Sequence, residues 1–143
     1  MKVSTKGRYA LRMMLDLALN DRGEYISLKD ISLRQGITVK YLEQIVTGLT
    51  RAGFLRSQRG NSGGYRLARR PEEYTAGEIL RAAEGDLSPV ACLVGEHNDC
   101  VRADSCFVLS FWTGLSKAID DYVDGYTLQD FVDQARSGDN YSI

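Results

Sequence analysis

Two short helical patterns, joined by a four-residue turn, lie in the first half of the sequence. Ser27 is the predicted N-cap of the first helix, which ends at Gly36. Thr38 is the predicted N-cap of the second helix, which stops at Gly53. A turn this tight needs a residue in the left-handed backbone conformation, which glycine adopts readily. The pattern is typical of a helix-turn-helix, although an ordinary helical hairpin would contain the same turn.

The residues after the second helix favour the helix-turn-helix. Residues 54–57 and 65–67 have the composition of short β-strands, and they flank the basic, glycine-rich loop 58–64. Helix, turn, helix and then a basic hairpin is the order of a winged helix. A nucleotide-binding glycine loop is the competing interpretation, but the glycines lack the G-x-G-x-x-G spacing and no Lys-Ser/Thr pair follows them. The predicted fold is therefore mainly α with a small β wing.

Helical patterns also flank this unit on both sides. Thr5 is the predicted cap of a first helix, and residues 75–83 form a short helix that begins with a capping box. The loop-like residues 87–105 follow. A long helix then begins near Cys106, and Thr127 caps a final short helix.

The long C-terminal helix carries an apolar stripe at helical spacing. The stripe consists of Leu109, Trp112, Leu115 (or Ser116), Ile119 and Tyr122. Because a loop separates this helix from the main domain, a second copy of the chain is the natural cover for the stripe, and packing on its own domain is the alternative. The predicted division is a winged helix-turn-helix over residues 1–70, a linker helix with the cysteine loop over 71–105, and dimerisation and C-terminal helices over 106–143.

Charge is distributed unevenly along a chain whose net charge is only −1. Residues 1–70 hold 14 lysines and arginines against 5 acids, and residues 71–143 hold the remaining 4 against 14. A basic half can follow the phosphates of nucleic acid while an acidic half stays away from them. No apolar run approaches the ~20 residues of a membrane span, and the N-terminus lacks a signal-peptide block, so a cytoplasmic protein is expected.

The expected partner of the basic half is double-stranded DNA. The second helix of a helix-turn-helix enters the major groove with its N-terminal residues against the base edges. Here those residues include Thr38, Lys40, Tyr41, Glu43 and Gln44. Gln44 can pair with adenine, Glu43 can accept from cytosine, and Lys40 can reach guanine or phosphate. The predicted contacts of the wing are Arg59, Gly60, Ser62 and Gly63. Arg59 suits a narrow minor groove, and the glycines let backbone approach the sugar-phosphate.

Three cysteines lie close together in the sequence, in the predicted loop or at the start of the next helix. Cys92, Cys100 and Cys106 are separated by seven and five residues. Thiolates are soft ligands for iron-sulfur clusters and for zinc, so this concentration predicts a cluster or metal site. A set of redox-sensing thiols is the alternative. His97, between the first two cysteines, is either a further ligand or a solvated loop histidine.

Several motifs together resemble the iron-sulfur cluster regulator (IscR) family, which also includes the nitric-oxide-sensing NsrR and the cysteine-metabolism CymR repressors. They are STKGRYA at 4–10, YLEQ at 41–44, RGNSGGY at 59–65 and the three cysteines. The resemblance extends to about residue 132. It implies a homodimer held by the long C-terminal helix, two winged helices that read a palindromic promoter site, and a cluster whose occupancy changes DNA affinity or site choice. IscR-like members carry a [2Fe-2S] cluster, and the nitric-oxide sensors carry a [4Fe-4S] cluster.

By matched position, the resemblance also implies roles for individual residues. The cysteines would be cluster ligands, Glu43 and Gln44 base readers, and Arg59 the minor-groove reader. The chain departs from the family in two ways: seven rather than five residues lie between the first two cysteines, and Leu109 stands where IscR has a histidine ligand. The aspartate that nitric-oxide sensors use on the first helix corresponds to Arg8. The fourth ligand therefore stays open among His97, Glu96, Asp99, a residue of the partner subunit or a small exogenous molecule.

The leading functional hypothesis is a cluster-responsive repressor of iron-sulfur assembly genes, including its own operon. The alternatives within the same fold are a nitric-oxide- or thiol-redox-sensing repressor and a zinc-stabilised DNA-binding module. An enzyme is not supported, since the sequence has no paired acid/base constellation and no cofactor loop, and only His97 is available to activate a nucleophile. Neither a small-molecule substrate nor a membrane partner is expected.

Overall fold

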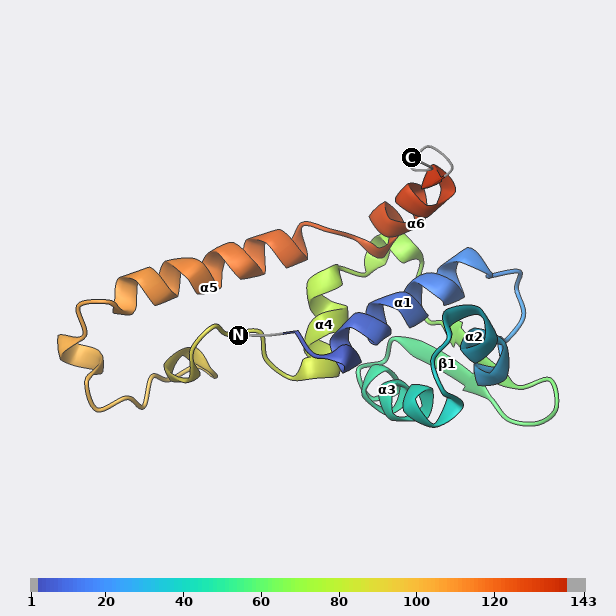
Figure 1. Ribbon diagram of the computed structural model, residues 1–143, viewed down its shortest axis with the longest axis horizontal. Helices are drawn as coiled ribbons and strands as arrows, with labels where there is room; N and C mark the ends of the chain where they lie inside the picture. Colours follow the sequence, from blue (N-terminus) through green and yellow to red (C-terminus); the bar gives the residue numbers. More distant parts are fainter. Residues whose placement is uncertain (1–2, 139–143) are drawn as a thin grey trace.

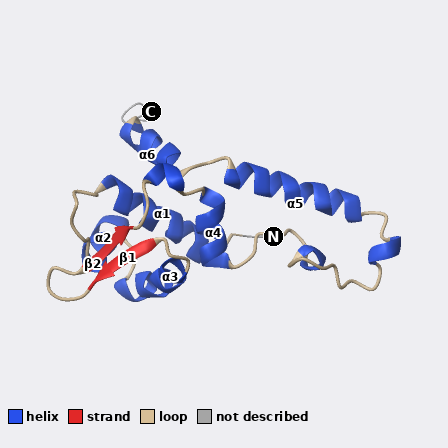
Figure 2. Cartoon of the chain, turned by 180° about the vertical axis from the view of Figure 1, so that it is seen from behind, coloured by secondary structure: helices blue, strands red, loops and turns tan. Residues whose placement is uncertain are grey.

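A computed structural model of the protein describes residues 3–138 (Figure 1). Along the chain it contains α1 Thr5–Leu19, α2 Leu28–Gln35, α3 Val39–Arg51, β1 Leu55–Gln58, β2 Gly64–Leu67, α4 Ala76–Glu84, α5 Leu109–Asp124 and α6 Leu128–Arg136. Short 3-10 turns lie at Pro71–Glu73, Ala91–Leu93 and Ala103–Ser105. The helices and a two-stranded antiparallel sheet make a winged helix, which confirms the predicted fold class (Figure 2).

The helix-turn-helix is built by local hydrogen bonds that the sequence predicts. Ser27 and Thr38 each accept a hydrogen bond of 3.1 Å from the backbone N–H three residues on, so each caps its helix. Gly36 ends α2 with φ of 67°, the left-handed conformation expected of the turn. Thr75 and Thr127 close reciprocal capping boxes at the starts of α4 and α6. These predicted caps are confirmed.

The predicted cap of α1 is wrong by one residue. Ser4, not Thr5, has the extended backbone of an N-cap, and its Oγ accepts from the N–H of Lys6. A distant carboxylate completes the cap: Glu84 Oε1 accepts from Ser4 N–H at 2.8 Å, from Ser4 Oγ at 2.6 Å and from Gly7 N–H at 2.9 Å. Although burial alone would raise it, these hydrogen bonds from Ser4 and Gly7 lower the pKa of Glu84. The last residue of α4 is thus tied to the first turn of α1.

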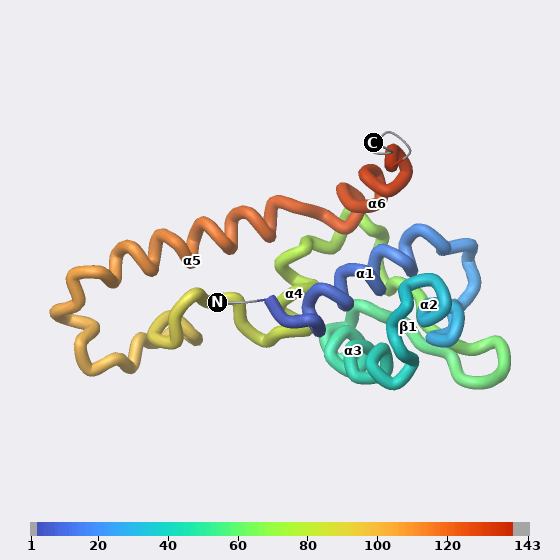
Figure 3. Tube along the Cα trace, in the orientation of Figure 1, coloured from blue at the N-terminus to red at the C-terminus, as the bar shows by residue number. Residues whose placement is uncertain are grey.

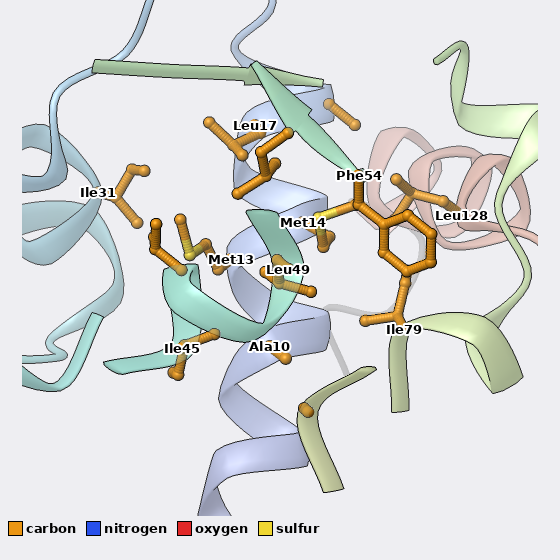
Figure 4. Packing of buried hydrophobic residues seen from close by; sticks show 14 of the residues in the cluster. Ala10, Met13, Met14, Leu17, Ile31, Ile45, Leu49, Phe54, Ile79 and Leu128 are labelled. Carbon is orange, nitrogen blue, oxygen red and sulfur yellow. The ribbon is translucent and has the colours of Figure 1, made fainter. Parts of the chain in front are cut away.

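The hydrophobic core is arranged around α1, which lies between the helix-turn-helix on one side and α4 and α6 on the other (Figure 4). Its largest fully buried apolar side chains, apart from Tyr74, are Met13, Met14, Leu17, Ile31, Leu42, Ile45, Leu49, Ile79, Leu128 and Val132. Because α4 and α6 contribute to the same core as α1 to α3, burial of apolar surface joins these helices into one body. The division of the chain at residues 70 and 105 stays a prediction.

Residues 85–108, which we call the cysteine arm, and α5 extend together away from this body (Figures 1 and 3). Arg81 of α4 holds the end of α5 that lies nearest the body, through bonds of 2.7 Å to Asp124 and 2.8 Å to Asp120. Within the described residues, α5 has no buried side chain. No helix over residues 3–138 has the length and apolar character to cross a membrane.

Candidate nucleic-acid interface

Helix α3 divides its side chains between the core and the solvent. Its inner face buries Leu42, Ile45, Val46 and Leu49, positions three or four residues apart. The opposite face exposes four of the predicted DNA-contacting residues: Thr38, Lys40, Glu43 and Gln44. The core packing thus orients α3 so that donors, acceptors and one positive charge point outward from its N-terminal half. These are the groups that base edges and phosphates require.

Tyr41 differs from the other predicted residues of α3 because its side chain is half-buried. Its ring packs edge-on against Tyr9 of α1, with the ring centroids 5.5 Å apart. The Arg12 guanidinium in turn lies 5.1 Å from the centroid of the Tyr9 ring. Tyr41 therefore anchors the first turn of α3 to α1. Its predicted contact with DNA stays a prediction.

The wing is the hairpin of β1 and β2, paired in register from Leu55 opposite Leu67 to Gln58 opposite Gly64. Arg59, Gly60 and Ser62 are exposed at its tip. Figures 1 and 2 show this loop and α3 on the same lower side of the body, away from α5. The structure thus places the two predicted DNA-contacting segments on one side of the molecule, which is the arrangement a winged helix uses to reach adjacent grooves.

Two glycines of the wing are needed for close backbone approach. A Cβ at Gly63 would lie 2.2 Å from the carbonyl oxygen of Gln58, inside the hairpin turn. A Cβ at Gly64 would lie 2.1 Å from the carbonyl oxygen of Ile26, where an isolated bridge between Ile26 and Tyr65 joins the wing to the body. Gly63, which the sequence assigns to phosphate approach, therefore also has a structural role.

Replacing Gly64 by alanine is expected to lower the free energy of unfolding by about 1–3 kcal/mol, because the backbone must move to relieve the clash with Ile26. Chemical denaturation followed by circular dichroism measures the change. Asn61→Ala is the matched control: it removes atoms from an exposed position of the same loop, so the free energy of unfolding should stay within about 0.5 kcal/mol of wild type. Equal stability of Gly64→Ala and wild type would contradict the close approach.

All three cysteines are free thiols on the cysteine arm. Cys92 and Cys106 are half-buried, and Cys100 is exposed together with His97. Within residues 3–138, no group of three or more His, Cys, Asp or Glu side chains is gathered in a geometry that would hold a metal ion. The structure thus places the predicted ligands on one segment but does not bring them together.

Reasoning from the sequence missed one polar site beside the helix-turn-helix. Asp16 of α1 is only 2% exposed, and it binds the side chains of Arg34 and Gln35 at the end of α2. The available signal was an acid placed between the core positions Met13 and Leu17 on the apolar stripe of α1. Buried carboxylates are rare without a partner, so this position had to have one.

The fold is a winged helix, and α3, the second helix of its helix-turn-helix, has an exposed polar edge. Together these features define a DNA-binding transcriptional regulator. The chain belongs to the Rrf2 family of iron-dependent transcriptional regulators, whose family model matches residues 3–134. The family consists of DNA-binding regulators rather than enzymes, as the sequence predicts.

Individual relatives agree with this assignment. IscR of Aliivibrio salmonicida is 38% identical over 132 residues, which cover 92% of this chain and 77% of that protein. The structure of CymR, the global cysteine regulator of B. subtilis, has a TM-score of 0.74 at 37% identity and covers 93% of this chain and 97% of its own. T. potens IscR has a TM-score of 0.73 at 38% identity over 94% and 88% of the two chains. The predicted resemblance to IscR and CymR regulators is confirmed.

Proposed function

We propose that the protein is a homodimeric repressor of iron-sulfur assembly genes, including its own operon, and that the occupancy of an iron-sulfur cluster controls its binding to a palindromic promoter site. The observation that carries this proposal is the position of the chain's three cysteines, all on the cysteine arm and outside the hydrophobic core. The iron-dependence in the family's description and the similarity to IscR of Aliivibrio salmonicida support it.

In this proposal the exposed edge of α3 reads bases in the major groove. Gln44 donates to and accepts from adenine, and Glu43 accepts from the amino group of cytosine. Lys40 contacts guanine or phosphate, while Thr38 and the free N–H groups at the start of α3 bind a phosphate oxygen. In the wing, Arg59 enters the minor groove, and the backbone at Gly60, Ser62 and Gly63 follows the sugar-phosphate chain. The exposure of Arg59 and Gly60 at the tip of the wing is consistent with these roles.

The chemistry of the donor set fits an iron-sulfur cluster. Three soft sulfur ligands lie on a segment whose only regular structure is two 3-10 turns, so their positions are not constrained by a long helix or strand. Cys92, Cys100 and Cys106 would hold the cluster, with the fourth ligand from His97, Glu96, Asp99, the partner subunit or a small molecule. The bound cluster would supply a redox-active and chemically labile group. Its type is proposed as [2Fe-2S], with [4Fe-4S] as the alternative.

The cysteine arm joins the DNA-binding body directly at its start and indirectly at its other end, through the length of α5. The arm begins directly after Glu84, whose carboxylate accepts the hydrogen bonds of Ser4 and Gly7 at the start of α1. It continues into α5, which Arg81 of α4 binds through two aspartates. A change in the order or charge of the arm therefore acts on residues that pack beside the helix-turn-helix. This continuity supports control of DNA binding by cluster occupancy.

The test is an iron, sulfide and zinc analysis of protein purified without oxygen, together with its visible absorption spectrum. About two irons per chain are expected for a [2Fe-2S] site. The matched control replaces all three cysteines by serine, which preserves shape and removes the soft ligands. DNA binding is then compared between cluster-loaded and cluster-free protein, using the duplex that the wild type selects from a random-sequence library.

The metal content and the absorption spectrum distinguish the proposed cluster from the alternative uses of the cysteines. About four irons per chain would replace the proposed cluster by [4Fe-4S] and favour nitric-oxide sensing. Zinc without colour would favour a zinc-stabilised module, and metal-free protein that changes its DNA affinity on thiol oxidation would favour redox sensing. Equal DNA affinity of the cluster-loaded and cluster-free forms would contradict control by cluster occupancy.

A further inference from the structure

Asp16 is the one buried charged residue in the described part of the chain, and both oxygens of its carboxylate accept hydrogen bonds. Arg34 donates to it twice, Nε to Oδ2 at 3.0 Å and Nη2 to Oδ1 at 2.7 Å. Gln35 Nε2 donates to Oδ2 at 2.9 Å. The carboxylate of Asp16 is buried, while the Arg34 side chain is 39% exposed. Removing a carboxylate from water is costly, and an ion pair with a buried member often contributes little net stability relative to apolar packing. The hydrogen bonds among Asp16, Arg34 and Gln35 therefore suggest a role other than stabilising the fold.

The partners of Asp16 stand directly before the turn of the helix-turn-helix. Arg34 and Gln35 are the last two residues of α2, and Gly36 follows them as the left-handed cap. Arg12, one turn before Asp16 on α1, also binds Gln35: its Nε donates to Gln35 Oε1 at 3.1 Å, and its Nη2 donates to the Gln35 backbone carbonyl. Two residues of α1 thus hold both the side chain and the main chain at the entrance to the turn.

The same side of α1 also contacts the far end of the turn. The Arg12 guanidinium lies over the ring of Tyr9, and Tyr9 packs edge-on against Tyr41 in the first turn of α3. The end of α2 and the start of α3 are therefore tied to neighbouring positions of one helix. Polar and aromatic contacts have narrow geometric preferences, so they specify an orientation that apolar packing alone leaves free to shift.

We propose that Asp16 is a positioning residue for DNA recognition: by holding Arg34 and Gln35 it sets the angle at which α3 enters the major groove. It touches no base, and its effect is on sequence discrimination rather than on phosphate attraction. Hydrogen bonds to base edges depend on the position of α3, whereas charge attraction to phosphates depends on it weakly. The inference rests on the proposed reading of bases by α3.

The test compares two affinities at a temperature where circular dichroism shows every variant folded. One duplex is the sequence that the wild type selects from a random library, and the other has the same composition in scrambled order. Asp16→Asn keeps the shape but directs an amide N–H toward the donors of Arg34 and Gln35. It should weaken binding to the selected duplex by about tenfold or more and leave the scrambled duplex within about twofold.

Ile79→Val is the matched control for a structural effect, because Ile79 is a fully buried core residue of α4, a helix outside the helix-turn-helix. This variant should lower the melting temperature and leave the ratio of the two affinities unchanged. If Asp16→Asn also leaves the ratio unchanged, the positioning role is overturned. If Asp16→Asn does not fold, Arg34→Lys replaces it in the test, because lysine keeps the positive charge but cannot make the two-pronged contact with Asp16. An Arg34→Lys protein with the same ratio of affinities as the wild type would also overturn the proposal. A wild type that selects no sequence would instead overturn base reading by α3 itself, and the positioning role with it.

Discussion

Raising the salt concentration from about 50 to about 200 mM is expected to weaken DNA binding by about 10³-fold or more. Each phosphate that a lysine or arginine neutralises releases a counterion, so the logarithm of the affinity falls linearly with the logarithm of the salt concentration. In the basic half of the chain, the exposed cations that make no ion pair within residues 3–138 are Lys6, Arg8, Arg12, Arg22, Lys29, Lys40, Arg51, Arg56 and Arg59. A dimer that uses three of them per protomer neutralises about six phosphates, which gives this loss.

A salt titration followed by fluorescence anisotropy measures the slope. Lys40→Ala should reduce it by about 2 for a dimer, one contact for each protomer. Arg136→Ala is the matched control: Arg136 is exposed on α6 in the acidic half, and its loss should leave the slope unchanged. A flat salt response of the wild type would contradict the role of the basic half in following phosphates.

The winged helix could be predicted from the sequence because its signals are local. A cap at Ser27 or Thr38 bonds to a backbone group only three residues away, and Gly36 needs its special conformation for the turn alone. The signals for the wing are local as well, because strand-forming residues directly flank a glycine-rich loop. The exposed edge of α3 followed from this fold, since the core positions of an amphipathic helix determine which residues face the solvent.

The parts that could not be predicted depend on contacts between distant residues. Ser4 rather than Thr5 caps α1, and the deciding partner is Glu84, eighty residues further along the chain. Asp16 meets Arg34 only after α1 and α2 pack together, so the sequence gives its polarity but not its partner. The cysteines are a different case: three thiols on an arm indicate soft-ligand chemistry, but the spacing of ligands on a loop does not determine the fourth ligand or the cluster type.

Replacing Phe111 by aspartate is expected to convert the proposed dimer to a monomer and to weaken binding to a palindromic duplex by at least about 100-fold. Phe111 is 62% exposed on α5, where its ring lies edge-on to that of Trp112. Most of this apolar side chain is therefore in contact with solvent in the single chain. The neighbouring Phe107 and Val108 are exposed as well. Adjacent exposed apolar side chains indicate a surface that a partner covers. Two linked half-site contacts bind far more tightly than one, and the loss of this linkage gives the expected factor.

Thr113→Asp is the matched control for this prediction, because it adds the same charge to an exposed position of α5 about 200° away around the helix from Phe111. It should stay dimeric and keep its DNA affinity. Sedimentation velocity measures the mass of each protein, and circular dichroism checks that the helices persist. A Phe111→Asp protein that stays dimeric would show that the two chains pair through another surface. A wild type that is monomeric at the concentrations that bind DNA would remove the dimer from the proposed function, and the apolar surface of α5 would then need a different partner.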